Sequence, residues 1–490
     1  MGYENATSGC LRTILLILAI ASWSHVHGQV YFEGLYGDIP SGQGIATDGT
    51  LATEGGYLSW SNSYGNLMPY LFRVDAEGVL LHEMFMEQPD SIDCLTQNLI
   101  AISDTLFVGV VSIKNHQHPL EIRGDYGLVN FSINGHLSWQ FTYGNSDRKE
   151  IPQRAIRTSD GGFAMSGQSV SGIDPNDDGE AYLIRIDALG NALWEQNYGG
   201  TLYDAASDLI QTLDGGFLIL GWTRSFGEGE RDFYLVKTDS LGNQQWQRTY
   251  GNSGNEGGWS IMRLTNGNYI LTGGGSDDGV TSHGRLYEVD PTGEVVWQRN
   301  YAMQSGNSLF KTLEMEDGSL VSVGLTTTSG EGNAGWLIKT DSEGIAQWQR
   351  KYNKNENTDL FYSLLATEDG GFLLSGQAVN EETNSQDAWL LKVDSVGCAY
   401  PNCIVGVDEA EPSKVMVDVW PNPTTDFLNI ELQQQGVAEV QLYDMAGKLL
   451  FQKQTTQLRE VIDVSALESG LYLLSVLQGD MKTTVKVMVW

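Results

Sequence analysis

The chain has 490 residues and a mass of 53.8 kDa, which corresponds to two to four domains, or to one repeat array with a small addition. Its 62 acidic residues against 28 Lys and Arg give a net charge of −34, which argues against nucleic acid and anionic membrane surfaces as partners. Hydrophobic residues make up 41%, enough for a folded core, and the 58 glycines with 13 Trp and 21 Tyr favour an all-β fold.

Residues 1–28 have the features of a secretory signal peptide. Arg12 precedes the apolar run 14–21, and a short segment then ends at Gly28, after which cleavage is expected. The alternative is a membrane anchor, but the run is well short of the ~20 apolar residues that a membrane-spanning helix needs. The rest of the sequence predicts no transmembrane segment.

An internal repeat organises residues 29–403. A Trp recurs about every 50 residues, with a Tyr four residues after it and a Gly four residues before it. A second turn, of the Asp-Gly-Gly type, lies further upstream in each unit, so each unit contains two hairpins. Four strands per unit is the composition of a β-propeller blade. The five Trp–Tyr pairs are Trp139/Tyr143, Trp194/Tyr198, Trp246/Tyr250, Trp297/Tyr301 and Trp348/Tyr352.

The number of third strands predicts seven blades, although six or eight remain alternatives. The last unit has no fourth strand of its own, whereas Phe32 and Tyr36 reproduce the spacing of the Trp–Tyr pairs at the other end of the chain. We therefore expect residues 29–37 to supply the outer strand of blade seven. The third strands end at Asp75, Ser132, Asp187, Asp239, Asp290, Asp341 and Asp394.

The aromatic rows have two interpretations. Residues i and i+4 of a strand face the same side, so one Trp and one Tyr per blade at fixed register are expected to pack between blades. The alternative is a stacking platform for sugars. The tight turns share one face of the ring, and the longer connections share the other, which we call the loop face and expect to carry binding.

The sharpest candidate site is a calcium loop at Asp174, Asn176 and Asp178, where alternating oxygens precede a Gly that permits the turn. The bidentate acid that usually closes such a loop is missing, and Glu180 is the candidate substitute. The alternative is an acidic, solvated loop. Calcium is the only cofactor that the sequence suggests.

Other chemistry-bearing residues are few. His116 and His118 could hold a transition metal, but no third ligand is visible, so a surface loop is favoured. Cys398 and Cys403 are expected to form a small disulfide, which leaves Cys94 without an assigned partner. No catalytic residue can be assigned, because the common nucleophile, metalloprotease and phosphate-loop motifs are absent.

The C-terminal segment 415–490 follows a linker at 404–414 and contains seven short alternating stretches, which predict a small immunoglobulin-like β-sandwich. Its motifs begin at Trp420-Pro-Asn-Pro and continue at 440–448, 462–467 and 469–474. In this order they closely resemble the C-terminal sorting domain of the type IX secretion system of Bacteroidetes-type bacteria. The resemblance implies export through the periplasm to the cell surface or the medium, with the secretion machinery as a partner.

Two functions fit this organisation. The sequence favours a non-catalytic surface or secreted propeller that binds a protein or a glycan through its loop face. The alternative is an extracellular polysaccharide-degrading enzyme, a lyase or hydrolase, with acidic residues gathered at the mouth of the central channel. The sequence names no ligand.

Overall fold

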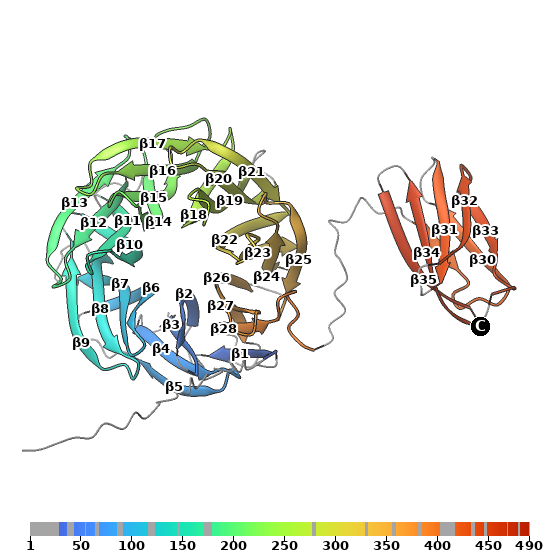
Figure 1. The fold of residues 1–490 in the computed structure, drawn as a ribbon, viewed down its shortest axis with the longest axis horizontal. Helices are drawn as coiled ribbons and strands as arrows, with labels where there is room; N and C mark the ends of the chain where they lie inside the picture. Colours follow the sequence, from blue (N-terminus) through green and yellow to red (C-terminus); the bar gives the residue numbers. More distant parts are fainter. Residues whose placement is uncertain are drawn as a thin grey trace, which may run out of the picture.

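The computed structural model describes residues 29–489 except for the gaps 37–43, 54, 64–67, 86–91, 116–122, 145–147, 171–178, 277–280, 329–331, 355–358, 381–384, 402–416, 433–436, 445–447, 468 and 479–480. The described residues form 35 strands and no helix, so none of them could cross a membrane as an apolar helix. The expected all-β fold, with a propeller and a small C-terminal sandwich, is confirmed (Figure 1).

Seven four-stranded antiparallel blades form the ring, and the first strand of each blade lies nearest the axis (Figure 1). Blade one contains β2 (Gly44–Thr53), β3 (Gly56–Ser63), β4 (Met68–Asp75) and β5 (Leu80–Phe85). Blade two contains β6 (Ile92–Ser103), β7 (Leu106–Asn115), β8 (Arg123–Ser132) and β9 (Leu137–Tyr143). Blade three contains β10 (Lys149–Arg157), β11 (Phe163–Val170), β12 (Glu180–Ile186) and β13 (Ala192–Tyr198).

The remaining blades repeat this order. Blade four contains β14 (Asp204–Gln211), β15 (Phe217–Thr223), β16 (Asp232–Thr238) and β17 (Gln244–Tyr250). Blade five contains β18 (Asn255–Arg263), β19 (Tyr269–Ser276), β20 (Ser282–Val289) and β21 (Val295–Tyr301). Blade six contains β22 (Gly306–Glu314), β23 (Leu320–Thr328), β24 (Gly332–Thr340) and β25 (Ala346–Tyr352). Blade seven contains β26 (Leu360–Ala366), β27 (Phe372–Asn380), β28 (Ser385–Val393) and β1 (Phe32–Tyr36).

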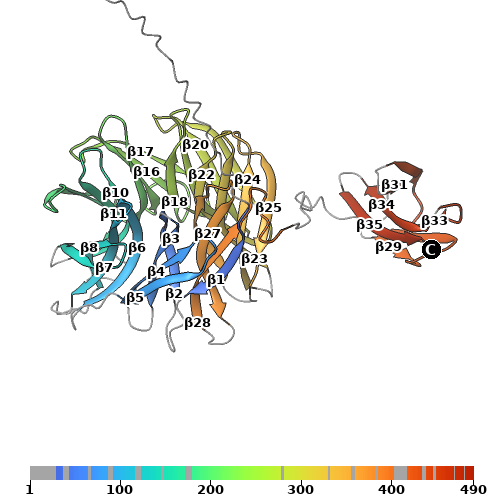
Figure 2. The same ribbon diagram turned by 60° about the horizontal axis from the view of Figure 1, so that its bottom comes forward.

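The two ends of the propeller meet in blade seven. Strand β1 pairs antiparallel with β28, from Phe32 opposite Lys392 to Tyr36 opposite Ala388. Figure 2, turned by 60° from Figure 1, also shows the two strands side by side. The outer edge of β28 is therefore paired, and the ring has no open strand edge at this junction.

The aromatic rows pack between blades, as expected from their register. Trp194, Trp246 and Trp297 pack against buried clusters of neighbouring blades. In each row, the Tyr hydroxyl donates a hydrogen bond to a glycine carbonyl in a turn of the next blade. The five bonds run from Tyr143 to Gly190, Tyr198 to Gly242, Tyr250 to Gly293, Tyr301 to Gly344 and Tyr352 to Gly397. The rows therefore hold adjacent blades together.

The tight turns adopt the conformation that their Asp and Gly residues favour. In the Asp-x-x-Gly turn of blade three, the Asp187 carboxylate accepts hydrogen bonds from the backbone N–H groups of Leu189 and Asn191. Gly190 adopts φ +88°, a left-handed conformation that glycine reaches without steric cost. These tight turns fix the lengths of the blades and leave the longer connections at the loop face.

The C-terminal strands pair only with one another among the described residues. One sheet contains β29 (Val417–Trp420), β30 (Phe427–Leu432) and β33 (Arg459–Asp463). The other contains β31 (Ala438–Asp444), β32 (Leu449–Thr455), β34 (Gly470–Gln478) and β35 (Met481–Val489). Inward-facing residues such as Leu428, Val440 and Leu474 form their common core. The domain boundaries at 403 and 415 stay predictions, because they lie outside the described residues.

Candidate functional site

The predicted calcium loop lies largely outside the described residues, because Asp174, Asn176 and Asp178 fall in the gap 171–178. Glu180 is described, at the start of β12. Its Oε2 accepts hydrogen bonds from Arg148 at 2.8 Å and from Asn197 at 2.9 Å. This carboxylate is thus committed to contacts within the blade, and the calcium site stays a prediction.

Of the candidate metal-binding histidines and disulfide cysteines, the structure describes only Cys398. His116 and His118 lie outside the described residues. Cys398 is buried and disulfide-bonded, but Cys403 falls in the gap that begins at residue 402, so their pairing stays a prediction. The parts of the chain that the structure describes hold no cluster of three or more His, Cys, Asp or Glu side chains arranged for a metal ion.

Several of the acidic residues described at the loop face, among them Asp204 and Asp359, are buried supports of the loops. The Asp204 carboxylate accepts hydrogen bonds from the Gly200 N–H and the Ser225 hydroxyl, both at 2.7 Å. The Asp359 carboxylate accepts one from the Lys354 N–H at 2.7 Å. Each of these two acids lies at the inner end of a blade and holds the connection that enters it. They are consequently not exposed carboxylates available for catalysis.

Asp232 performs the same role within blade four. Its carboxylate accepts hydrogen bonds from the N–H groups of Glu228 at 3.0 Å and Gly229 at 3.1 Å. Burial raises the pKa of Asp232, against the lowering effect of these two bonds. Close by, the fully buried Glu256 forms an ion pair with Arg285, with 3.4 Å between Oε1 and the guanidinium. These charged groups hold the loops in place around the cavity that is described next.

That cavity is the candidate functional site. It opens on the loop face over blades four, five and six and has a volume of about 800 Å³. Most of its lining is small and polar, and Trp259 contributes the large aromatic surface with 38% of the residue exposed. The lining residues are Glu230, Arg231, Ser253, Gly254, Asn255, Trp259, Gly274, Gly275, Ser276, Ser282, Asn307 and Ser308.

The floor of this cavity is rigid. Gly274 of blade five pairs with Ser308 of blade six, which joins the two blades into one sheet. A Cβ at Gly274 would lie 2.7 Å from the Ser308 hydroxyl, so a larger residue would require that hydroxyl to move. The Asn307 amide then donates to the carbonyls of Ser282 and Gln304. Two neighbouring blades are therefore fixed to each other beneath the cavity.

Arg231 lines one side of the cavity and lies against a pair of stacked aromatic rings. Tyr203 and Trp222 stack at 5.1 Å with an interplanar angle of 8°, and the Arg231 guanidinium lies 4.9 Å from the Trp222 ring centre. Arg231 Nε also donates to the Glu256 carbonyl at 3.2 Å. Burial, and next to it the charge of Arg224, lower the pKa of Arg231. The guanidinium is thereby held in one orientation beside the cavity.

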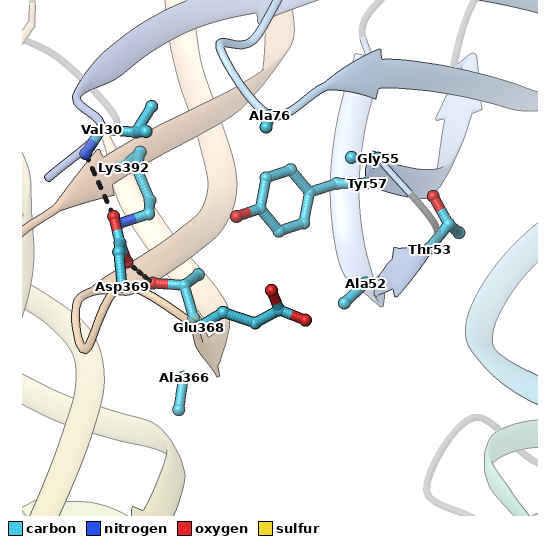
Figure 3. Close-up of a pocket in the computed structure, with 12 residues that line it drawn as sticks. Val30, Ala52, Thr53, Gly55, Tyr57, Ala76, Ala366, Glu368, Asp369 and Lys392 are labelled. Carbon is cyan, nitrogen blue, oxygen red and sulfur yellow. Dashed lines mark hydrogen bonds and ion pairs between the residues drawn. The ribbon is translucent and has the colours of Figure 1, made fainter. Parts of the chain in front are cut away.

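A second cavity, of about 420 Å³, lies between blades seven and one at the tight-turn face (Figure 3). Its central carboxylate is already occupied, because Asp369 accepts hydrogen bonds from the Val30 N–H at 3.1 Å and from Lys392 at 2.9 Å. Tyr57 and Glu368 extend into the same space in Figure 3. The Asp–base pair recurs in other blades as Asp160–Arg185, Asp214–Lys237 and Asp317–Lys339. Its repetition around the ring marks it as structural.

Sequence reasoning missed the importance of Trp259. It is one of 13 Trp residues, and it does not belong to the repeated Trp row. In the structure it occupies a bulge in β18, where the pairing with β19 shifts between Gly258 and Ser260. Its departure from the repeat is the one signal that could have identified it.

Comparison with known proteins supports the C-terminal resemblance. Residues 418–490 match the family described as the secretion system C-terminal sorting domain. Among curated proteins, an ulvan lyase, NLR42 of Nonlabens ulvanivorans, is 25% identical over 134 residues, which are 26% of this chain and 25% of that enzyme. The chain thus matches about a quarter of this relative's length. The match is longer than the stretch 418–490, so it is not confined to the sorting domain.

Solved structures give weaker likenesses. The polysaccharide lyase Uly1 aligns with a TM-score of 0.43 and 10% identity, over 77% of this chain and 94% of that one. A fungal alcohol oxidase of the AA5 family aligns with a TM-score of 0.43 and 12% identity, over 94% and 99%. The Pan2 WD40 domain of Neurospora crassa gives 0.42 and 10%, over 76% and 95%. At these scores the structural likenesses carry no argument about activity.

The sorting domain supplies the identification that the propeller does not. Its sequence motifs, its two-sheet sandwich and the family match over 418–490 agree. A sorting domain of this kind is recognised by the type IX secretion system, which exports its passengers from the periplasm. The chain is therefore a type IX secretion passenger, a secreted or cell-surface β-propeller with a C-terminal sorting domain.

Proposed function

We propose that this protein is an extracellular lyase that binds and cleaves an acidic polysaccharide at its loop face. The observation that carries the proposal is the 800 Å³ cavity, which combines the exposed face of Trp259 with the oriented guanidinium of Arg231. An aromatic ring packs against the apolar face of a sugar, and a guanidinium binds a carboxylate or sulfate. The sequence relation to an ulvan lyase supports the same substrate class.

The chemistry of the cavity favours elimination over hydrolysis. Glycoside hydrolysis needs two carboxyl groups on opposite sides of the scissile bond. Of the described residues that line the cavity, Glu230 is the only acid, and the neighbouring Asp232 and Glu256 are buried in loop contacts. In elimination, a base removes the proton beside the uronate carboxylate, and a carbon–carbon double bond forms as the bond to the departing sugar's oxygen breaks. An acid then returns a proton to that oxygen. A cation beside the carboxylate favours this proton loss.

The overall charge of −34 would repel an acidic polymer at low salt. At the ionic strength of seawater this long-range repulsion is screened over a few ångströms, whereas a contact between Arg231 and a carboxylate persists. We therefore expect binding to strengthen from low salt to moderate salt. A protein that bound only through a basic surface would show the opposite dependence.

The test uses the purified full chain and a panel of uronate-containing polysaccharides, with matched neutral polysaccharides as controls. Binding and the ultraviolet absorbance of unsaturated sugar ends are measured. Trp259→Ala should weaken binding at least tenfold, whereas Tyr400→Ala, at an exposed aromatic outside the cavity, should leave it unchanged. Absence of both binding and cleavage in the folded protein would contradict the proposal.

A second candidate function is binding without catalysis, because few of the described lining residues carry groups that act as acids, bases or nucleophiles. The amide of Asn307 and the hydroxyl of Ser282 are both engaged in hydrogen bonds within the protein. Such a cavity suits recognition as well as catalysis. Binding of a glycan without any cleavage would favour the non-catalytic surface protein that the sequence alone indicated.

A further inference from the structure

The beginning and the end of the sorting domain meet at one edge of its sandwich. Strand β29 ends at Trp420, and the loop 421–426 leads from it into β30. Strand β35 is the last strand of the domain, and among the described strands only β34 pairs with it. The loop covers the opposite edge of β35, where Thr424 forms a parallel bridge with Val489 and donates from its N–H to the Met488 carbonyl at 2.9 Å.

The side chain of Asn422 makes this contact specific. Its amide nitrogen donates to the Lys486 carbonyl at 2.7 Å, and its amide oxygen accepts from the Met488 N–H at 2.9 Å. A side-chain amide suits this place because it carries donors and an acceptor on one group. Asn422 thereby takes up backbone groups that an additional strand would otherwise pair with. We call the contacts of Asn422 and Thr424 with β35 the clamp.

The loop that carries the clamp is also fixed by β30. The Asn429 side-chain amide donates to the Trp420 carbonyl at 3.0 Å, and the Thr424 hydroxyl donates to the Phe427 carbonyl at 2.7 Å. Thr424 itself is buried. The two bonds from Asn422 join residues that are 64 and 66 positions apart in the sequence. The clamp therefore forms only when both ends of the domain have folded together.

Two large apolar side chains are exposed beside the clamp. Trp420, two residues before Asn422, is 40% exposed, and Met488, whose N–H binds Asn422, is 38% exposed. Val487 and Val489 belong to the buried core of the domain, so Met488 faces outward, as the alternation along a strand requires. Tryptophan and methionine are enriched at protein–protein interfaces. The clamp thus holds two residues suited to binding a protein at one edge of the sandwich.

The match to the sorting-domain family makes the secretion machinery the partner that recognises this domain. We propose that the machinery recognises a composite surface, which the clamp assembles from the loop after β29 and the last strand β35, with Trp420 and Met488 as contact residues. The partner is a protein with an apolar docking site. Asn422 is a positioning residue for export, because it fixes β35 against the loop. This inference concerns export and goes beyond the proposed lyase activity.

The test is export of the full chain from the native host, measured by cell fractionation. Asn422→Ala removes both side-chain bonds to β35, so export should fall roughly tenfold. Gln441→Ala is the matched control, because this amide also bridges two groups. It donates to Glu439 at 3.2 Å and accepts from the Tyr443 hydroxyl at 2.7 Å, but it lies in β31, which does not pair with β35. Its export should equal that of the wild type.

Hydrogen exchange on the purified full chain separates positioning from folding. In Asn422→Ala the amides of β34 should stay protected, because β34 also pairs with β31, whereas the Met488 amide should exchange faster because it has lost its acceptor. The double variant Trp420→Ala/Met488→Ala keeps the clamp, which uses only Asn422 and backbone groups. Its export should also fall roughly tenfold. Leu458→Ala, at another exposed apolar residue of the domain, should be exported normally.

Wild-type export of Asn422→Ala, or of the double variant Trp420→Ala/Met488→Ala, would overturn the composite surface. Either result would mean that the machinery reads another part of the domain. If Asn422→Ala also lost protection in β34, the double variant would decide, since its hydrogen bonds to β35 are intact. Polysaccharide cleavage is not part of these measurements, so the proposed lyase activity and the composite surface stand or fall separately.

Discussion

The hydroxyl of Tyr36 donates a hydrogen bond of 2.6 Å to the carbonyl of Gly78, and this bond joins the two ends of the propeller. It belongs to the series that links each blade to the turn of the next, with Tyr36 at the end of blade seven and Gly78 in blade one. Burial, and after it the charge of Asp75, raise the pKa of Tyr36 to about 12, so the hydroxyl remains a donor across the physiological range.

Tyr36→Phe removes this bond and keeps the ring packing, so it should lower the free energy of unfolding by about 1 kcal/mol. Tyr198→Phe is the matched control, because it removes the equivalent bond to Gly242 between two blades that are continuous in the chain. Urea denaturation monitored by Trp fluorescence measures both. A cost for Tyr198→Phe without a cost for Tyr36→Phe would show that the closing contact contributes nothing to stability.

Deletion of residues 29–37 should have a larger effect than loss of one hydroxyl. It removes β1 and exposes the edge of β28, from Ala388 to Lys392, for pairing with other molecules. We expect the deleted protein to aggregate, which size-exclusion chromatography with light scattering can detect. A monomeric deletion variant with the stability of the wild type would contradict the closure of blade seven by the N-terminal strand.

Lys311 in β22 predicts an unusual dependence of stability on pH. Burial, and after it the charge of Arg154, lower the pKa of Lys311 in the folded protein to about 7, whereas an unfolded lysine titrates near 10.4. Between about pH 7 and pH 10 the unfolded chain therefore binds one more proton than the folded chain. The free energy of unfolding should therefore rise between about pH 7 and pH 10, with a contribution of at most about 1.4 kcal/mol per pH unit from this residue.

The measurement is denaturant unfolding at several pH values, with Lys311→Met as the comparison. The difference between wild type and variant should change steadily above pH 7 and stay constant below it. A difference that is independent of pH would show that Lys311 titrates normally in the folded protein.

Truncation after Lys414 should separate export from folding. The described strands of the sorting domain pair only with one another, so the propeller should fold without them. In the native host the truncated protein should accumulate in the periplasm, and cell fractionation can show this. Export of the truncated chain at the wild-type level would contradict the role of 418–490 as the export signal.

The fold could be predicted from the sequence because each blade repeats the same local chemistry. The Gly before each Trp adopts a left-handed turn, and the Tyr after it bonds the next turn, so the pattern encodes contacts within and between blades. The closing strand could be recognised for the same reason, since Phe32 and Tyr36 repeat the spacing. The strands of the sorting domain could be predicted for a similar reason, because buried and exposed residues alternate along them, as in β30.

The candidate site could not be predicted in the same way, because its residues depart from the repeat. The pairing of the innermost strand shifts at Gln153, Ser207 and Trp259 in three successive blades, and these three residues share no sequence pattern that would reveal the shift. The burial of Asp204 and Asp359 could not be predicted either, because nothing in the sequence distinguishes a buried acid from an exposed one among so many acidic residues. The sequence analysis named no positions for acids at the channel mouth, so that part of the alternative function stays a prediction.

Mass spectrometry of the cleavage products would show whether the propeller cleaves an acidic polysaccharide by elimination. Elimination leaves an unsaturated sugar at each new non-reducing end, whereas hydrolysis adds one water molecule to every broken bond. We predict oligosaccharides with unsaturated ends from a uronate-containing polymer, with their yield reduced at least tenfold in Trp259→Ala. Products that carry the added water, or an intact polymer after prolonged incubation with folded protein, would show that the protein is not a polysaccharide lyase.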